Sequence, residues 1–185
     1  MRYIYAVFYA FNINLLLFLL CLTFASALFI NLFDFSMSVR RIKIISNGEG
    51  ILDMKFYYTA EEAYYIIDSQ QQSGRKAYKN FLLFFDTCFP LLYAVAFSAL
   101  LAKVFLKTFP ETMWMHYLII VPFIVAIFDY LENFSIIAIL VKYPKRIWIA
   151  NIAGYFTACK WLFALLGISL LLFGTTKIFI MRQWF

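Results

Sequence analysis

Six polar side chains lie inside stretches that are otherwise apolar enough to cross a bilayer. An ionisable group near the centre of a membrane costs about 3 kcal/mol or more, so it normally faces a protein interior, a partner or a water-filled cavity. Carboxyl, ammonium, phenol and amide groups gathered there could pair with one another, bind a headgroup or transfer protons. The candidates are Asp86, Tyr93, Asp129, Glu132, Asn133 and Lys160.

Helical spacing brings most of these groups to one depth and one face. Asp129 lies about as far before the end of its apolar run as Lys160 lies after the start of the next. Both therefore lie about 18–20 Å from the same surface at ~1.5 Å per residue. Glu132 and Asn133 follow Asp129 by about one turn and share its face. Because Asp86 enters from the same surface, one polar pocket can hold them all.

A proline modifies the segment that carries Asp86. Pro90 has no N–H to donate to the Asp86 carbonyl one turn earlier, so that carbonyl loses its helical partner and the helix is free to bend there. Tyr93 lies about two turns after Asp86 on the same face. We therefore expect the Tyr93 hydroxyl to reach the pocket.

The charges of this pocket do not balance. Asp86, Asp129 and Glu132 against Lys160 would leave two negative charges without a counter-ion in a low dielectric, so a proton, cation, water or ligand is required. A structural network that sets helix register is one interpretation. A site for a lipid headgroup, small amphiphile or cation, a path for protons or solutes, and acid–base catalysis remain alternatives.

Four apolar runs must position these residues. The chain has 185 residues, of which 65% are hydrophobic and 14% charged, and its mean hydropathy of +0.82 excludes a soluble domain. A span needs roughly 20 apolar residues, and lipid requires that the spans be helices. We predict an all-α membrane protein, a four-transmembrane-helix bundle with a structured first loop. The predicted spans are residues 12–33, 81–106, 117–141 and 147–173, which divide the chain into 1–35, a loop at 36–80, and 81–185.

Basic residues lie at the ends of the apolar runs. The net charge of +6 is therefore explained by anchoring at the membrane surface and by orientation, and we expect the lipid bilayer rather than a nucleic acid as partner. More of these residues lie on the side of loop 36–80, which places that loop inside. The protein is predicted to be multi-pass, in a bacterial inner membrane or an organellar membrane.

Loop 36–80 has order of its own. Apolar and polar residues alternate on both sides of Asn47-Gly48, which predicts a short β-hairpin. Thr59 and Glu62 form a capping box, which predicts an amphipathic helix over residues 60–72 that stops at Ser73-Gly74. This helix is either a lid that buries its own apolar stripe or a docking surface for a protein or for lipid headgroups.

No motif indicates a metal, a cofactor or an enzyme. Cys21, Cys88 and Cys159 lie one per span without ligand spacing, and His116 lies in an aromatic stretch typical of a membrane interface. Two carboxyls near a lysine could exchange protons, but no nucleophile elbow or phosphate-binding loop accompanies them. We expect neither metal nor cofactor, and a role other than catalysis.

Four groups of residues carry a family resemblance: Gly74-Arg75 with Tyr78, Asp86-x-x-Phe89-Pro90-x-x-Tyr93, Asp129-x-x-Glu132-Asn133 and Lys160-Trp161. With these residues, the part of the chain from about residue 52 to residue 172 resembles a family of small four-span integral membrane proteins. The resemblance implies the four-helix fold and a shared polar pocket, and implies no activity. A looser similarity is to the emopamil-binding and sterol-receptor superfamily, whose small helical bundles bind cationic amphiphiles through intramembrane carboxyls.

Two functions follow from these features. An ordered loop and 22% aromatic residues favour a structural or assembly subunit of a larger membrane complex, with protein partners. The alternative is a self-contained lipid- or small-amphiphile-binding protein, carrier or enzyme that uses the pocket of Asp86, Asp129, Glu132 and Lys160. We favour the subunit on the sequence alone, with a pocket that is structural or occupied by lipid.

Overall fold

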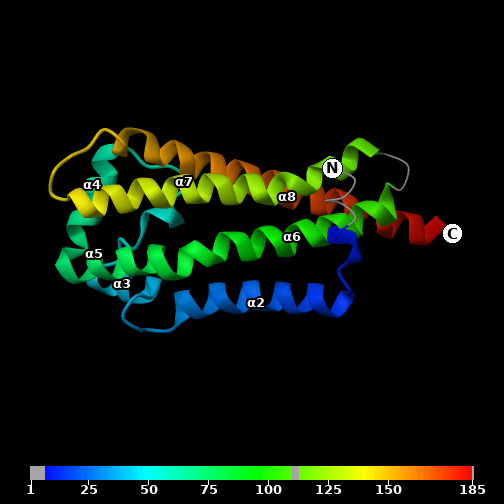
Figure 1. Cartoon of the computed structure of the whole chain (residues 1–185), viewed down its shortest axis with the longest axis horizontal. Helices are drawn as coiled ribbons and strands as arrows, with labels where there is room; N and C mark the ends of the chain where they lie inside the picture. Colours follow the sequence, from blue (N-terminus) through cyan, green and yellow to red (C-terminus); the bar gives the residue numbers. More distant parts are fainter. Residues whose placement is uncertain (1–6, 110–112, 185) are drawn as a thin grey trace.

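Four long helices run side by side along the length of the molecule (Figure 1). The computed structural model describes residues 7–109 and 113–184, and in this part it contains helices and turns but no strand. The four helices are long and apolar enough to cross a membrane. The predicted four-span helical bundle is thus confirmed. Its helices are α2 (Ile13–Leu32), α6 (Asp86–Thr108), α7 (Val121–Lys142) and α8 (Ala150–Trp184).

Helix α2 is the outermost of the four and packs on α6 (Figure 1). The Asn12 side chain caps its start by accepting a hydrogen bond from the N–H of Leu15 at 2.7 Å. Few of its side chains are buried, among them Leu16 and Ile30, so most of its apolar surface is available to lipid.

The second span is the continuation of a helix that begins in the loop. Helix α5 (Gln71–Asn80) passes through a π turn (Phe81–Phe85) into α6 without a break. A π turn inserts an extra residue into the helical repeat and is common beside functional groups. Here the turn comes directly before Asp86 and contributes to setting the direction in which its side chain projects.

Helices α7 and α8 are the most closely associated pair in the bundle. A 3₁₀ segment (Met113–Ile120) leads into α7, with Pro122 in its first turn, where a missing N–H costs nothing. Small residues on α8 let the chain approach closely. The nearest approach is at Gly154, where an added Cβ would lie 1.9 Å from the Tyr58 carbonyl oxygen.

The predicted β-hairpin is wrong. Residues Val39–Ile45 form helix α3, and Leu52–Met54 form a single 3₁₀ turn. Asn47 and Gly48 do take positive φ angles of 52° and 101°, as a hairpin turn would require. They instead end α3, because the N–H of Gly48 donates to the Lys43 carbonyl at 2.8 Å, as at many helix C-termini.

The predicted amphipathic helix is present but shorter. The capping box of Thr59 and Glu62 is formed, and α4 (Ala60–Ser69) follows it. The break comes at Gln71, with φ 54°, so the predicted stop at Ser73-Gly74 is wrong. Gly74 lies inside α5, where an added Cβ would lie 3.2 Å from Ile45 of α3. Its small size therefore serves the contact between two helices.

The loop folds back over one end of the bundle. Helices α3, α4 and α5 gather at that end (Figure 1). Their buried side chains join those of α7 and α8 in one apolar core, so the loop and the spans form a continuous structure. The core includes Ile42, Leu52, Tyr58, Ile67, Tyr78, Ile136, Ile139 and Ala153.

Candidate functional site

Lys160 lies at the centre of a buried cluster of charges. Its Nζ is 2.5 Å from Glu132 Oε2 and 3.2 Å from Asp129 Oδ1. The predicted match in depth between α7 and α8 is therefore correct. A buried ion pair stabilises a fold only when its remaining lone pairs are also satisfied.

Hydroxyl groups on α6 and α8 donate hydrogen bonds to the two carboxylates that pair with Lys160. Tyr93 donates its hydroxyl proton to Asp129 Oδ2 at 2.9 Å, as its position on α6 predicted. Thr157 donates to Glu132 Oε1 at 2.6 Å, a contact that was not predicted from the sequence. The signal was present, because Thr157 lies one turn before Lys160 on the same face of α8.

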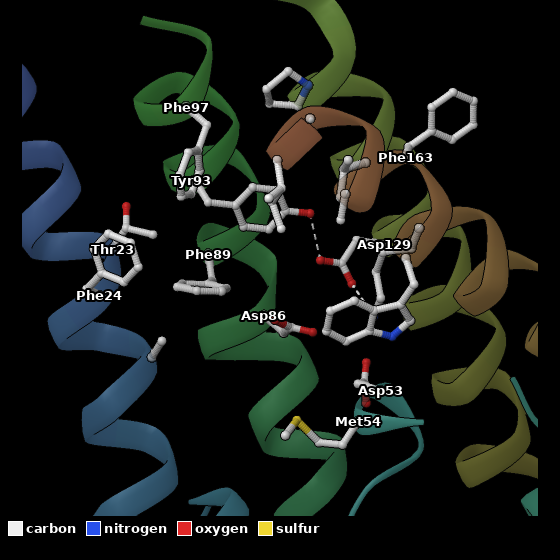
Figure 2. A pocket seen from close by; sticks show the side chains of 18 of the residues that line it. Thr23, Phe24, Asp53, Met54, Asp86, Phe89, Tyr93, Phe97, Asp129 and Phe163 are labelled. Atoms are coloured by element: carbon white, nitrogen blue, oxygen red, sulfur yellow. Dashed lines mark hydrogen bonds and ion pairs between the residues drawn. The ribbon is translucent and has the colours of Figure 1, made fainter. Parts of the chain in front are cut away.

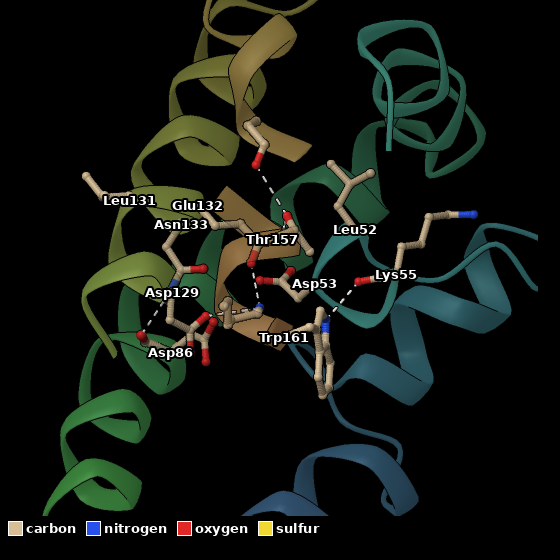
Figure 3. Close-up of polar contacts among 12 residues, drawn as sticks. Leu52, Asp53, Lys55, Asp86, Asp129, Leu131, Glu132, Asn133, Thr157 and Trp161 are labelled. Atoms are coloured by element: carbon tan, nitrogen blue, oxygen red, sulfur yellow. Dashed lines mark hydrogen bonds and ion pairs between the residues drawn. The ribbon is translucent and has the colours of Figure 1, made fainter. Parts of the chain in front are cut away.

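The Asp86 carbonyl, which Pro90 leaves without its helical hydrogen bond, accepts a hydrogen bond from another helix. Asn133 Nδ2 donates to the backbone oxygen of Asp86 at 3.2 Å (Figure 3). An amide on α7 thus replaces the hydrogen bond that Pro90 cannot make within α6. The structure therefore brings together all six predicted residues.

The site contains a fourth carboxyl that was not predicted from the sequence. Asp53 projects from the 3₁₀ turn of the loop into the bundle, where it is 8% exposed. Tyr78 donates its hydroxyl proton to Asp53 Oδ2 and accepts the N–H of Leu52 at 3.1 Å. Burial raises the pKa of Asp53, with the nearby Lys160 acting in the opposite direction.

Several contacts hold the Asp53 segment against the bundle. Trp161 Nε1 donates to the Lys55 carbonyl at 2.8 Å (Figure 3). Gln70 donates to the Gly50 carbonyl at 2.8 Å, and Gly154 leaves room for the Tyr58 backbone. The side chain of Asp53 is thus placed by backbone contacts on both sides of it.

The charged cluster faces a cavity of about 380 Å³. Figure 2 shows this space with α2 on one side, α6 behind and α7 and α8 on the other. The walls are mainly aromatic and aliphatic, and the polar groups Asp53, Asp86, Asp129 and Lys160 line one part. The site therefore combines a long apolar surface with a compact charged region. Apolar lining residues include Phe24, Phe89, Phe97, Phe163 and Ile168.

The buried oxygens at the cluster that lack a donor include one on Asp53 and one on Asn133. Within the described residues, Asp53 Oδ1 and Asn133 Oδ1 are buried and have no hydrogen-bond partner. Buried polar atoms are normally paired, because an unpaired one costs about 1–3 kcal/mol. The cluster therefore has unused capacity to accept hydrogen bonds or to coordinate a cation.

Comparisons with known proteins do not assign this site. No protein-family model, no curated protein and no solved structure matches the chain. The resemblance to a small four-span family stays a prediction, and the functional interpretation rests on the geometry of the site.

Proposed function

We propose that this protein binds a lipid or small amphiphile, taken from the bilayer, in the cavity between α2 and α8. The observation that carries the proposal is a charged cluster that opens onto an apolar cavity of about 380 Å³. Ligand sites are commonly 300–1,000 Å³, mostly apolar, with a few polar groups that orient the ligand.

The arrangement of the helices around the cavity favours entry of the ligand from the membrane. Helix α2 packs mainly on α6 and α3, and α8 packs mainly on α7, α6 and α4. The two walls of the cavity are therefore joined through α6. An apolar chain can enter between α2 and α8 without leaving the hydrocarbon, which avoids the cost of exposing it to water.

The polar end favours a ligand with a headgroup. A network that served only to set helix register would be expected to be enclosed by side chains. Here Asp86, Asp129 and Lys160 line the cavity, so a headgroup could contact them while the tail lies against Phe89 and Phe97. The headgroup would thereby replace part of the hydration that these groups lose on burial.

Filling the cavity tests the proposal. Gly167 lines it, and an added Cβ would meet only Val121, at 3.7 Å, so Gly167→Phe should fold and occupy the space. Leu165→Phe is the matched control, because Leu165 is an exposed residue of the same helix outside the cavity. Native mass spectrometry should detect an amphiphile on wild type and on Leu165→Phe, and none on Gly167→Phe.

The same experiment examines the subunit role, which stays a prediction. Gentle extraction of a tagged chain would reveal heterologous subunits in fixed stoichiometry if the protein belongs to a complex. A wild-type chain that carries no amphiphile, or a Gly167→Phe variant that retains it, would contradict binding in the cavity.

A further inference from the structure

Three aspartates from three separate segments converge beside the cavity. Asp53 comes from the loop, Asp86 from the start of α6 and Asp129 from the middle of α7. One carboxylate oxygen from each lies within 4.8 Å of the others, and all three residues are buried. Oxygens bound to one ion at 2.3–2.6 Å, as around Ca²⁺, are separated by up to about twice that distance.

Lys160 cannot neutralise this trio. Among the described residues its ammonium forms ion pairs with Glu132 Oε2, at 2.5 Å, and with Asp129 Oδ1, at 3.2 Å, and it acts on Asp53 from a greater distance. Because Lys160 also pairs with Glu132, its single positive charge is shared between Glu132 and the three aspartates. Like charges this close cannot all ionise in a low dielectric without a counter-ion.

The side chain of Asn133 is a further observation that favours a cation beside the three aspartates. Asn133 is 4% exposed, and its Oδ1 has no hydrogen-bond partner among the described residues. Because its Nδ2 donates to the Asp86 carbonyl, the amide is oriented with Oδ1 on the side that faces Asp53 (Figure 3). Asp53 Oδ1 is likewise without a donor. Oxygens that lack donors are suited to coordinating a cation.

We propose that Asp53, Asp86 and Asp129 bind one divalent cation of the oxygen-preferring class, with Asn133 Oδ1 as a further ligand. Carboxylate and amide oxygens select Ca²⁺, Mg²⁺ or Mn²⁺ over metals that prefer nitrogen or sulfur. The separation of the carboxylate oxygens is suited to Ca²⁺, and the adjoining cavity has room for waters that complete the coordination.

This site goes beyond amphiphile binding and does not require it. A divalent ion would neutralise most of the charge of the trio and tie the loop to α6 and α7. Asp53 would be the ligand that the loop contributes to the site.

Calcium titration tests the proposal directly. The full chain is stripped with a chelator, reconstituted in nanodiscs of uncharged phosphatidylcholine and titrated with Ca²⁺, Mg²⁺ or Mn²⁺ by calorimetry. Wild type should bind one ion per chain. Asp53→Asn and Asp86→Asn should each weaken binding about 10- to 100-fold or more, the loss typical of even the outer groups of a metal site.

Matched variants distinguish binding at this site from ion binding at surface carboxylates. Asp34→Asn removes an exposed carboxylate near Arg41 and should bind the ion as wild type does. Gly167→Phe should lose the amphiphile and keep the ion, so either proposal can fail alone. Asp53→Asn lies outside the spans, which keeps the test open if Asp86→Asn does not fold. Folded wild type that binds no ion in a one-to-one ratio, or Asp53→Asn that binds it unchanged, would overturn the proposal.

Discussion

The two ends of the bundle are held together in different ways. At the loop end, hydrogen bonds and ion pairs join separate elements, as between Tyr78 and Asp53, Trp161 and Lys55, and Lys160 and Glu132. At the opposite end, a core of Ala, Leu, Val and Phe side chains joins α6 to its neighbours, and the polar links among the described residues there include one from Ser98 to the Ile119 carbonyl at 2.7 Å.

The loop end fixes the relative positions of its helices more strictly than the opposite end does. Apolar packing between membrane helices is adaptable, because lipid tails are as apolar as the side chains they replace. Directed hydrogen bonds tolerate little displacement, and a broken one leaves a buried polar group unpaired. The loop end should therefore respond sharply to substitution, and the opposite end mildly.

The largest difference in stability between the two ends should come from replacing one lysine at each end. Lys160→Met leaves Asp129 and Glu132 without their cation, and should lower the free energy of unfolding by about 3–5 kcal/mol. Lys177 lies over the Phe109 ring, 3.9 Å from its centroid, at the opposite end. Lys177→Met should cost about 1 kcal/mol or less. Thermal unfolding in detergent measures both, and equal losses would remove the contrast.

Two glycines of α8, one at each end of the bundle, allow a second test of this difference. An alanine Cβ at Gly154 would lie 1.9 Å from the Tyr58 carbonyl oxygen, whereas one at Gly174 would lie 2.4 Å from the Val104 side chain, which can rotate. Gly154→Ala should cost about 3 kcal/mol and Gly174→Ala about 1 kcal/mol. Unfolding midpoints report this order, and a reversal would show that the loop is free to move away from α8.

A double substitution isolates one hydrogen bond of the site. Asn133→Ala leaves the Asp86 carbonyl without a donor and should cost about 2 kcal/mol. Pro90→Ala restores an N–H one turn after Asp86, so the cost of Asn133→Ala should fall in that background. The coupling energy from the four proteins measures the effect. Additive costs would mean that Asn133 does not substitute for the missing N–H.

The smallest effect concerns the cap of α4 and depends on pH. The Thr59 N–H, and then its side chain, hydrogen-bond to Glu62 and hold its pKa below the ordinary value of 4.5. The folded pKa is depressed, so this stabilisation is present above pH 4.5 and is lost as pH falls through the folded pKa. Hydrogen exchange of the α4 amides should accelerate relative to other helices in acid.

Two variants separate the parts of this cap. Thr59→Ala should weaken α4 by about 1 kcal/mol at neutral pH. Glu62→Gln should remove the dependence on acid while Thr59 still caps the helix. An unchanged acid response in Glu62→Gln would assign the effect to another group.

Much of the candidate site could be predicted because helices obey a local rule. Rise per residue placed Asp129 and Lys160 at one depth, and Pro90 identified a carbonyl that needed a donor. Asp53 could not be predicted in this way. Its neighbours alternate in polarity as in a strand, and in such a strand Asp53 would lie on the polar face. The 3₁₀ turn and the contact with Tyr78 instead turn it into the bundle.

Several features could be predicted from the residues alone: a multi-span membrane protein, its four spans, the capping box of α4 and the six residues of the polar cluster. Each of these depends on composition, on a repeat of 3.6 residues or on contacts within one turn. The path of the loop, the approach of Tyr58 to Gly154, the cavity and the trio of aspartates became visible only in the folded chain. These features depend on contacts between residues far apart in the chain, where packing decides among local conformations of similar energy.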